Sequence, residues 1–241
     1  MKKKNYLTRN DGEISAIIFT RSADVRAFRR LLLEWYGKYG RHFPWRNKSA
    51  NSYQRIVAEV LLQRTRAENV ASFYGKFVRK YPSWKKLALA TEKELGLFLK
   101  PLGLWKRRAS SLLRLASELT KRNGRFPRTR EEIESLPNVG QYIANAVHLF
   151  CLGDPQPLLD SNMARVLERY FGPRNLADIR YDPYLQALAK SCVTCKDSIL
   201  LNWSILDLGA LICTLRNPRH ASCPLSRRCK YAIEDYWPTC P

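Results

Sequence analysis

Two short stretches in the middle of the chain combine residue types that could bind a phosphate and act on what it carries. The first is a tight turn, Pro137–Gly140, placed directly before an apolar helical segment. The free N–H groups at a helix start and the positive end of the helix dipole favour an anion there. The second is Asp160, twenty residues after Gly140 and directly before another helical segment. The pattern predicts a phosphate held by the turn and a carboxylate presented to the group attached to it.

Each stretch also has an ordinary structural interpretation. Short turns of the LPxxG kind often join two helices without binding anything, and for the turn alone this is the better interpretation. Asp160 stands before SNMAR and would be a good helix N-cap, which stabilises a helix by about 0.5–2 kcal/mol. The same helix start would keep the carboxylate ionised, so capping and chemistry are compatible at this residue.

The end of the chain carries cysteines and a histidine at regular spacing. Helical periodicity stops at Cys213, and the pattern continues as x6-His220-x2-Cys223-x5-Cys229. Three thiolates and one imidazole suit tetrahedral zinc, and imidazole can also replace a thiolate on iron. Cys240 could supply the fourth ligand in place of His220. A tail that packs without any metal is a further alternative.

The charge of the chain points to a polyanionic partner. Forty-two Lys and Arg against 21 Asp and Glu give a net charge of +21, far more than solubility requires. The 45% of hydrophobic residues and six Trp indicate a folded domain and not a basic tail. No apolar run approaches the roughly 20 residues of a membrane span, and the N-terminus lacks the apolar segment of a signal peptide. We therefore expect a cytoplasmic protein whose partner is nucleic acid and not a membrane, with its cysteines reduced or bound to metal.

The apolar residues recur at helical spacing along most of the chain, and no segment keeps a period of two. The spacing predicts an all-α fold with short connections. Residues 1–22 are polar and basic, and we expect them to form a flexible arm. Helices are expected from Val25 and at 53–65, 69–81, 84–90, 92–99, 106–121, 141–151, 162–170, 183–189 and 200–212.

Further motifs surround the turn and Asp160 in a fixed order. They are FPWR at 43–46, AEVLLQRT at 58–65, PLGL at 101–104, FPRTREEIESLP at 126–137, LPNVGQYIANAV at 136–147, NMARV at 162–166 and LDLGALIC at 206–213. In this order they resemble the helix-hairpin-helix DNA glycosylase superfamily, which includes endonuclease III, the adenine DNA glycosylases and the thymine-DNA mismatch glycosylases. The resemblance covers nearly everything after the N-terminal arm.

The resemblance implies two helical lobes with double-stranded DNA bound in the cleft between them and one nucleotide turned out of the stack. We expect a helical barrel with the helix-hairpin-helix at 51–154. The second lobe is expected to combine 23–50 with 155–241, and to include a cluster loop at 213–229. The resemblance further implies a protein that acts as a monomer on DNA with a mismatched base.

The resemblance also bears on the cysteine tail. The usual family pattern is C-x6-C-x2-C-x5-C, which holds a [4Fe-4S] cluster and shapes a basic loop against DNA. Here His220 stands where the second cysteine belongs. Because the other three ligand positions keep their spacing, we expect the cluster to be present, with zinc or no metal as the alternatives.

Three residues receive catalytic roles from the resemblance. Bifunctional members carry a Lys at position 142 that attacks the sugar C1′ and leads to strand cleavage. Tyr142 cannot form an imine, so the resemblance implies a monofunctional enzyme in which Asp160 stabilises the oxocarbenium-like sugar and steers a water. Glu59 matches the family's helix acid near the flipped base and could protonate the leaving base if burial raises its pKa. The alternatives are a packed aromatic side chain for Tyr142 and a surface carboxylate for Glu59.

The DNA contacts follow from the same motifs. Gln63 and Arg64 are expected to enter the gap left by the flipped base, although Arg64 could instead hold a phosphate. Leu104 stands where adenine glycosylases usually carry Tyr, and Arg64 where they carry Gln. The hairpin residues expected to hold the DNA backbone are Asn138, Val139 and Gly140.

Arg64 and Leu104 differ from the residues usual in adenine glycosylases, and the chain ends directly after the cysteine tail. Both features favour a glycosylase that removes thymine mispaired with guanine. Uracil lacks only the methyl group and should also be accepted. An adenine DNA glycosylase acting on A:G or A:8-oxoguanine pairs is the second hypothesis. A catalytically idle DNA-binding module is the third, and the presence of both Asp160 and Glu59 speaks against it.

Overall fold

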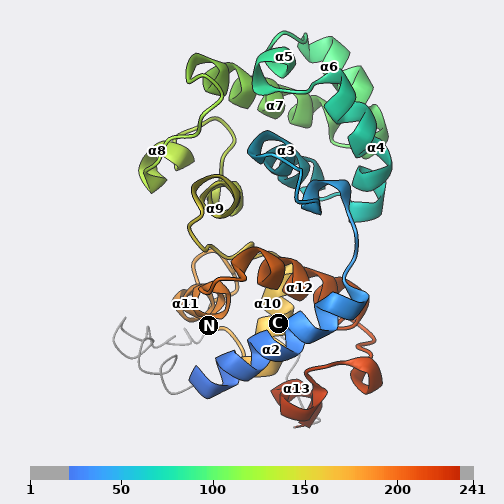
Figure 1. The fold of residues 1–241 in the computed structure, drawn as a ribbon, viewed down its shortest axis with the longest axis vertical. Helices are drawn as coiled ribbons and strands as arrows, with labels where there is room; N and C mark the ends of the chain where they lie inside the picture. Colours follow the sequence, from blue (N-terminus) through green and yellow to red (C-terminus); the bar gives the residue numbers. More distant parts are fainter. Residues whose placement is uncertain (1–21, 234–241) are drawn as a thin grey trace, which may run out of the picture. The chain divides into compact units, whose positions relative to one another are not determined.

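A computed structural model of the protein describes residues 22–233, and in this range the chain forms helices and loops without a β-strand. The expected all-α class is therefore confirmed. The chain forms two compact units, of which one spans His42–Asp154 and the other joins the chain up to Arg41 to the chain from Pro155 onward (Figure 1). The expected arm at 1–22 lies outside the described residues, apart from Ser22, the first residue of a helix. Within the described residues, no helix is long and apolar enough to cross a membrane.

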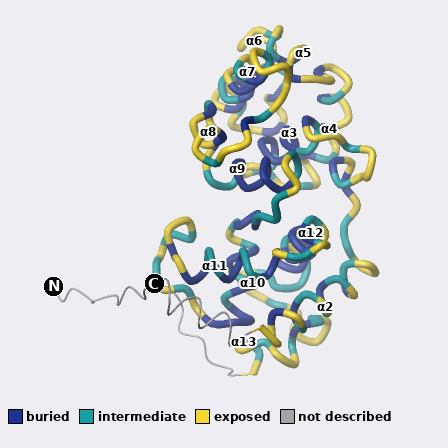
Figure 2. The backbone as a smooth tube through the Cα atoms, turned by 60° about the vertical axis from the view of Figure 1, so that its left-hand side comes forward, coloured by how far each residue is buried: buried dark blue, intermediate teal, exposed yellow. Residues whose placement is uncertain are grey.

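The unit at His42–Asp154 carries the hairpin. Helices α5 and α6 pack against α7, and α3 packs against α4 and α9. Figure 2 shows α3 and α9 mostly buried, because both are apolar on more than one side. The elements are α3 (Ser52–Leu62), α4 (Ala67–Lys80), α5 (Trp84–Ala88), α6 (Glu92–Leu99), α7 (Trp105–Lys121), α8 (Arg130–Glu134), α9 (Gln141–Val147) and a π-helical turn, His148–Leu152.

The second unit is arranged around α12, which contacts α2, α10 and α11. Helix α12 is apolar on all sides, as a central helix must be. Two buried polar side chains of α12 fix chain segments around it. Asp207 pairs with Arg41 at 2.8 Å, and Asn202 accepts a hydrogen bond of 2.7 Å from the Leu158 N–H, in the segment that leads to Asp160. The helices are α2 (Ser22–Tyr39), α10 (Ser161–Phe171), α11 (Pro183–Val193), α12 (Ser198–Leu211) and α13 (Lys230–Ile233).

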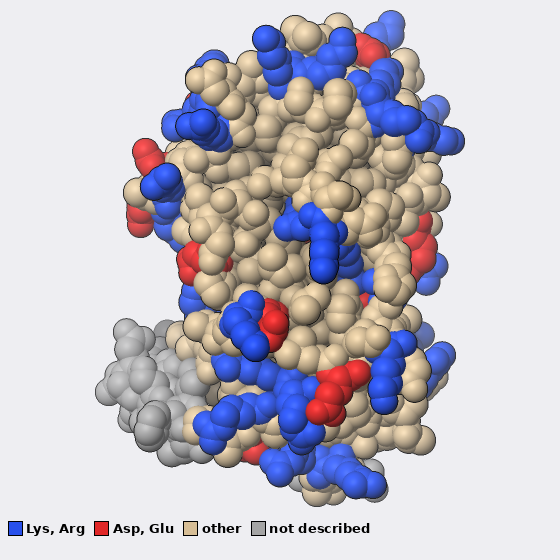
Figure 3. Space-filling view, in the orientation of Figure 1, with Lys and Arg blue, Asp and Glu red and all other residues tan. Residues whose placement is uncertain are grey.

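Lys and Arg side chains dominate the charged surface of both units on the face that Figure 3 shows. This follows from a composition with twice as many basic as acidic residues, 42 against 21. A surface of this kind attracts polyanions over the length of a Debye screening distance, about 8–10 Å at physiological salt.

Candidate active site

The hairpin between α8 and α9 takes its shape from a single left-handed residue. Asn138 has φ +61°, a conformation that Asn tolerates better than most residues, and the Val139 N–H donates to the Leu136 carbonyl. Gly140 is extended and precedes α9, and a Cβ added there would meet nothing within 4 Å. Neither backbone conformation nor packing within the protein therefore requires glycine at this position. The open space beside the Gly140 backbone is what close approach of a phosphate to the hairpin needs.

A side-chain contact locks the two helices of the hairpin together. Arg130 on α8 donates to the Asn145 side-chain oxygen on α9 at 2.7 Å, and it also pairs with Glu134 on its own helix. Asn145 is buried, so the contact is shielded from water. The geometry of the hairpin is thus set in the protein before any ligand binds.

Tyr142 and Glu59 meet directly. The Tyr142 hydroxyl, in the first turn of α9, donates to Glu59 Oε2 on α3 at 2.9 Å. Glu59 is 3% exposed, so its interpretation as a surface carboxylate is wrong. The packing of α3 against α9 brings together two residues that are 83 positions apart in the sequence and to which the family resemblance gives catalytic roles.

Asp160 is the N-cap of α10, as its sequence context predicts. One carboxylate oxygen accepts from the Asn162 and Met163 N–H groups at 2.9 and 2.8 Å, and the other accepts from the Asn162 side-chain amide at 3.2 Å. Burial raises the pKa of Asp160, and these hydrogen bonds oppose that shift. The carboxylate is thereby held in one orientation at the start of its helix.

A chain of hydrogen bonds leads from Asp160 to the cysteine tail through two residues that sequence reasoning missed. Arg165 donates to the Asn162 side-chain oxygen at 2.8 Å and to the Cys213 carbonyl oxygen at 2.7 Å. Gly209 allows α12 to approach this point, since a Cβ there would lie 2.9 Å from Asn162 Cβ. The NMAR segment directly after Asp160 carried the signal, because Asn162 and Arg165 are three positions apart and so share one face of the helix.

The two loops predicted to contact DNA both contain a strained residue at the surface. Arg64, after α3, has φ +56°, and Leu104, before α7, has φ +49° and is 54% exposed. Gln63 is exposed beside Arg64. Non-glycine residues adopt this conformation at a cost in free energy and gather at functional sites.

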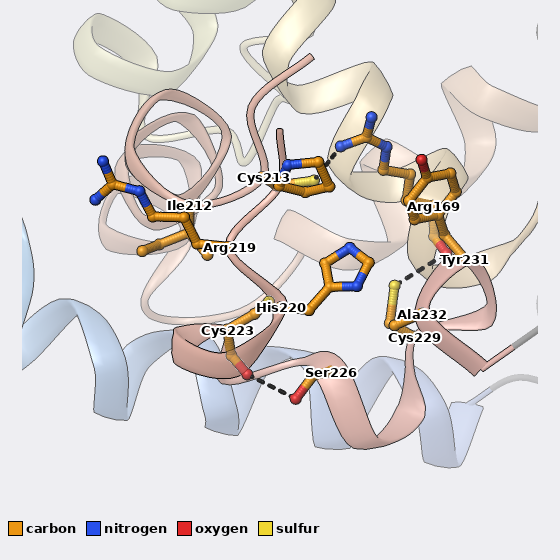
Figure 4. Close-up of a pocket in the computed structure, with 11 residues that line it drawn as sticks. Arg169, Ile212, Cys213, Arg219, His220, Cys223, Ser226, Cys229, Tyr231 and Ala232 are labelled. Carbon is orange, nitrogen blue, oxygen red and sulfur yellow. Dashed lines mark hydrogen bonds between the residues drawn. The ribbon is translucent and has the colours of Figure 1, made fainter. Parts of the chain in front are cut away.

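The four predicted metal ligands line one pocket. Figure 4 shows the His220 imidazole within this pocket, with Cys213, Cys223 and Cys229 around it. Burial raises the pKa of the Cys223 thiol to about 11 and also raises that of Cys229. A metal centre held here must displace these protons, since the thiolate is the ligand. Cys240, the alternative ligand, lies outside the described residues.

The ligand residues surround the pocket without converging on one point. Among the described residues, no three His, Cys, Asp or Glu side chains come together closely enough to hold a single metal ion. Arg169 donates to Cys213 Sγ at 3.3 Å, and its guanidinium stacks over the Tyr231 ring at 4.5 Å. The Tyr231 ring in turn meets the His220 ring edge-on at 5.7 Å. The described residues therefore form no ready site for a single metal ion.

The loop around the pocket is strongly basic. Its Lys and Arg side chains are exposed, and one of them, Arg228, lies 3.5 Å from Asp24 on α2. Exposed basic residues on a loop are the usual contacts to phosphates. They are Arg216, Arg219, Arg227, Arg228 and Lys230.

A helical hairpin, a capped aspartate and a basic loop over a Cys and His pocket together define a protein that works on nucleic acid. The chain belongs to the HhH-GPD superfamily of base excision DNA repair proteins, whose family model matches residues 57–197. The matched range contains both the hairpin and Asp160.

Relatives of known activity are similar over nearly the whole chain. A thymine-DNA glycosylase from Aeropyrum pernix is 40% identical over 91% of this chain and all of its own length. A thymine/uracil-DNA glycosylase from Pyrobaculum aerophilum is 36% identical over 87% of this chain and 93% of its own. An adenine DNA glycosylase from Mus musculus is 32% identical over 88% of this chain, which spans 43% of that protein.

Solved structures agree with the fold. A thermostable thymine-DNA glycosylase superimposes with a TM-score of 0.80 at 31% identity, over 87% of this chain and 97% of that one. Endonuclease III in a non-covalent complex with DNA gives a TM-score of 0.73 at 21% identity, over 88% and 97% of the two chains. The second likeness shows the shared fold alone.

Proposed function

We propose that this protein is a monofunctional DNA glycosylase that hydrolyses the N-glycosidic bond of thymine, and of uracil, mispaired with guanine. The observation that carries the proposal is the contact between Tyr142 and Glu59. A phenol at the hairpin position cannot form the imine through which a lysine would cut the strand. Thymine as the substrate rests on the similarity to the Aeropyrum and Pyrobaculum enzymes.

In the proposed reaction the bond between C1′ and the base nitrogen breaks and a water oxygen joins C1′. The Asp160 carboxylate stabilises the positive charge that develops on the sugar and orients the water. The proton lost by the water ends on the departing base, and Glu59, oriented by the Tyr142 hydroxyl, is the group that delivers it. The products are a free base and an abasic site in an intact strand.

The hairpin and the two strained loops hold the DNA in this proposal. Asn138, Val139 and Gly140 bind a phosphate, and the basic loop around the cysteine pocket binds others. Gln63, Arg64 and Leu104 occupy the space that the extruded nucleotide leaves. An adenine DNA glycosylase is the second candidate, because the mouse enzyme is 32% identical over most of this chain.

We further propose that Cys213, His220, Cys223 and Cys229 hold a [4Fe-4S] cluster. The donor set fits, because three half-buried thiols and an imidazole line one pocket. Each of the four irons of such a cluster takes one protein ligand, and the three cysteines keep the family's spacing along the chain. When bound, the cluster would fix the basic loop in shape. The Arg169 hydrogen bond to Cys213 would favour the thiolate form of that ligand.

An excision panel tests the function. Duplexes with G:T, G:U, A:G and A:8-oxoguanine pairs are incubated with the protein and then treated with alkali to break abasic sites. We expect cleavage of the G:T and G:U strands only after alkali. Cleavage of the adenine-containing strand instead would show that the protein is an adenine glycosylase. If no duplex is cleaved, the protein is a DNA-binding module without glycosylase activity.

A further inference from the structure

Arg108 is a buried arginine that joins the two loops carrying the strained residues. It lies in the first turn of α7 and is 5% exposed, and burial lowers its pKa. A guanidinium is rarely buried without a carboxylate. The partners that the described chain gives Arg108 are carbonyl oxygens and one hydroxyl.

The hydrogen bonds of Arg108 divide between the loops. One terminal nitrogen donates to the carbonyl oxygens of Leu102 and Gly103, at 3.1 and 2.9 Å. The other donates to the Gln63 carbonyl oxygen at 2.9 Å and to the Thr65 hydroxyl at 2.8 Å. The loop before α4 and the loop before α7 are therefore held by the two arms of one planar group.

The bonded atoms flank the strained residues. Gln63 and Thr65 stand on either side of Arg64, while Leu102 and Gly103 directly precede Leu104. Both strained residues have positive φ and exposed side chains. A left-handed residue persists only where its surroundings hold it. Arg108 supplies that restraint for both loops at once.

We propose that Arg108 is a positioning residue that sets Arg64 and Leu104 as one rigid two-pronged wedge for extruding the target nucleotide. The inference rests on the proposed function, because only a glycosylase that turns a base out of the duplex needs such a wedge. Arg108 does not itself touch the DNA. It acts by fixing the spacing of the two prongs before DNA binds.

The test measures extrusion apart from excision. Asp160→Asn serves as the background, so that bound DNA is not consumed, and 2-aminopurine beside a G:T pair reports extrusion by its fluorescence. We expect Arg108→Met to slow extrusion by about tenfold to a hundredfold, as small misplacements of positioned groups do. Arg108→Lys keeps the charge but cannot bridge four acceptors from one planar group, and it should fall between Arg108→Met and the native residue.

A matched control separates positioning from stability. Arg29 also donates to backbone carbonyls, those of Ser191, Cys192 and Thr194, but it belongs to the other unit. Arg29→Met should lower the melting temperature and leave extrusion unchanged. If Arg29→Met slows extrusion as much as an Arg108 variant with the same loss of melting temperature, the inference is wrong.

A double-mutant cycle with Leu104→Ala gives a second readout. If Arg108 acts through the wedge, Arg108→Lys and Leu104→Ala together should slow extrusion by less than the product of the two single effects, because the part that acts through Leu104 is already lost. Additive effects would overturn the positioning role. Failure of the proposed function is distinct from this result, because the unmodified protein would then release no base from G:T or G:U duplexes.

Discussion

At the scale of single residues, the proposed chemistry depends on charge held in a fixed place. Burial raises the pKa of Asp160, and hydrogen bonds from two N–H groups of its own helix and from the Asn162 amide oppose that rise. Glu59 is held by the Tyr142 hydroxyl. Changes that keep volume but remove a charge or a proton therefore test the assignment most directly.

Asp160→Asn should abolish excision and leave DNA binding near that of the unmodified protein. The change removes the negative charge that stabilises the sugar cation but hardly changes side-chain volume. Single-turnover excision and equilibrium binding to a G:T duplex measure the two effects. Undiminished turnover in this variant would remove Asp160 from the mechanism.

Excision should fall with decreasing pH through the raised pKa of Asp160, above the value of about 3.9 of an exposed aspartate. The free energy of unfolding changes with pH in the opposite direction to the excision rate. Because the pKa is higher in the folded than in the unfolded protein, the contribution of Asp160 to stability is present at low pH and is lost as pH rises through the folded pKa. Excision rates and circular dichroism over the same pH range should show activity lost before the fold. If activity and fold are lost at the same pH, the fall in excision at low pH is caused by unfolding and not by protonation of Asp160.

Tyr142→Lys should convert the protein into one that cuts the strand and forms an adduct trapped by borohydride. Lysine at this position supplies the amine that tyrosine lacks, and burial lowers the pKa of a lysine toward the neutral, nucleophilic form. Tyr142→Phe is the matched control, since it loses the hydrogen bond to Glu59 without gaining a nucleophile. A trapped adduct with the unmodified protein would contradict the monofunctional proposal.

His220 gives a residue-scale test of the cluster. We expect iron and sulfide in anaerobically purified protein, and a lower content in His220→Ala. His220→Cys restores the four-thiolate set and should hold at least as much iron as the unmodified protein. Metal analysis and visible absorption report this without measuring activity, and equal iron in His220→Ala would exclude His220 as a ligand.

At the scale of helices, much of the architecture could be predicted from sequence because the apolar spacing is regular. The helices expected at 92–99 and 106–121 correspond to α6 and α7, with bounds that agree to within one residue at each end. The helix expected at 141–151 is α9 followed by a π-helical turn, which periodicity cannot distinguish from a continued α-helix. Helix α11 continues to Val193, beyond the expected end at 189.

The parts of the site that sequence could not provide depend on contacts between distant segments. Arg108 is one basic residue in the run Lys106–Arg108, and nothing in the run marks it as the buried member. Its role appears only once the fold brings Gln63 and Thr65, more than 40 positions away, within hydrogen-bonding distance. The contact of Tyr142 with Glu59 is non-local in the same way, and only the family resemblance suggested that the two act together.

Gly209→Ala tests the close packing of α10 on α12. The new methyl group would lie 2.9 Å from Asn162 Cβ, so the helices must separate and move Asn162 away from Asp160. We expect a loss of about 1–3 kcal/mol in the free energy of unfolding and slower excision. Gly37→Ala on α2, where an added Cβ meets nothing within 4 Å, should instead stabilise by about 0.5–1 kcal/mol. Equal behaviour of the two variants would contradict this account.

At the scale of the whole molecule, the net charge of +21 predicts DNA binding that weakens steeply with salt. Each phosphate neutralised by a basic side chain releases counterions, and the slope of log affinity against log salt is about −0.9 per contact. Replacing Arg219 and Arg227 of the basic loop by Gln should make the slope less steep by roughly 2. Titrations at several salt concentrations measure it, and an unchanged slope would show that this loop does not contact DNA.

The order of the two units along the chain has a consequence for how the protein forms. The unit at His42–Asp154 is inserted into the other one, so α2 must wait for partners that emerge from the ribosome much later. Arg29 on α2 bonds Cys192, which lies 163 positions later in the chain. Arg41, in the loop after α2, bonds Asp207, 166 positions later. The inserted unit can fold first on contacts of shorter range. During synthesis the apolar face of α2, with Phe28 and Leu32, stays exposed until α10, α11 and α12 have been made, and such exposure favours aggregation.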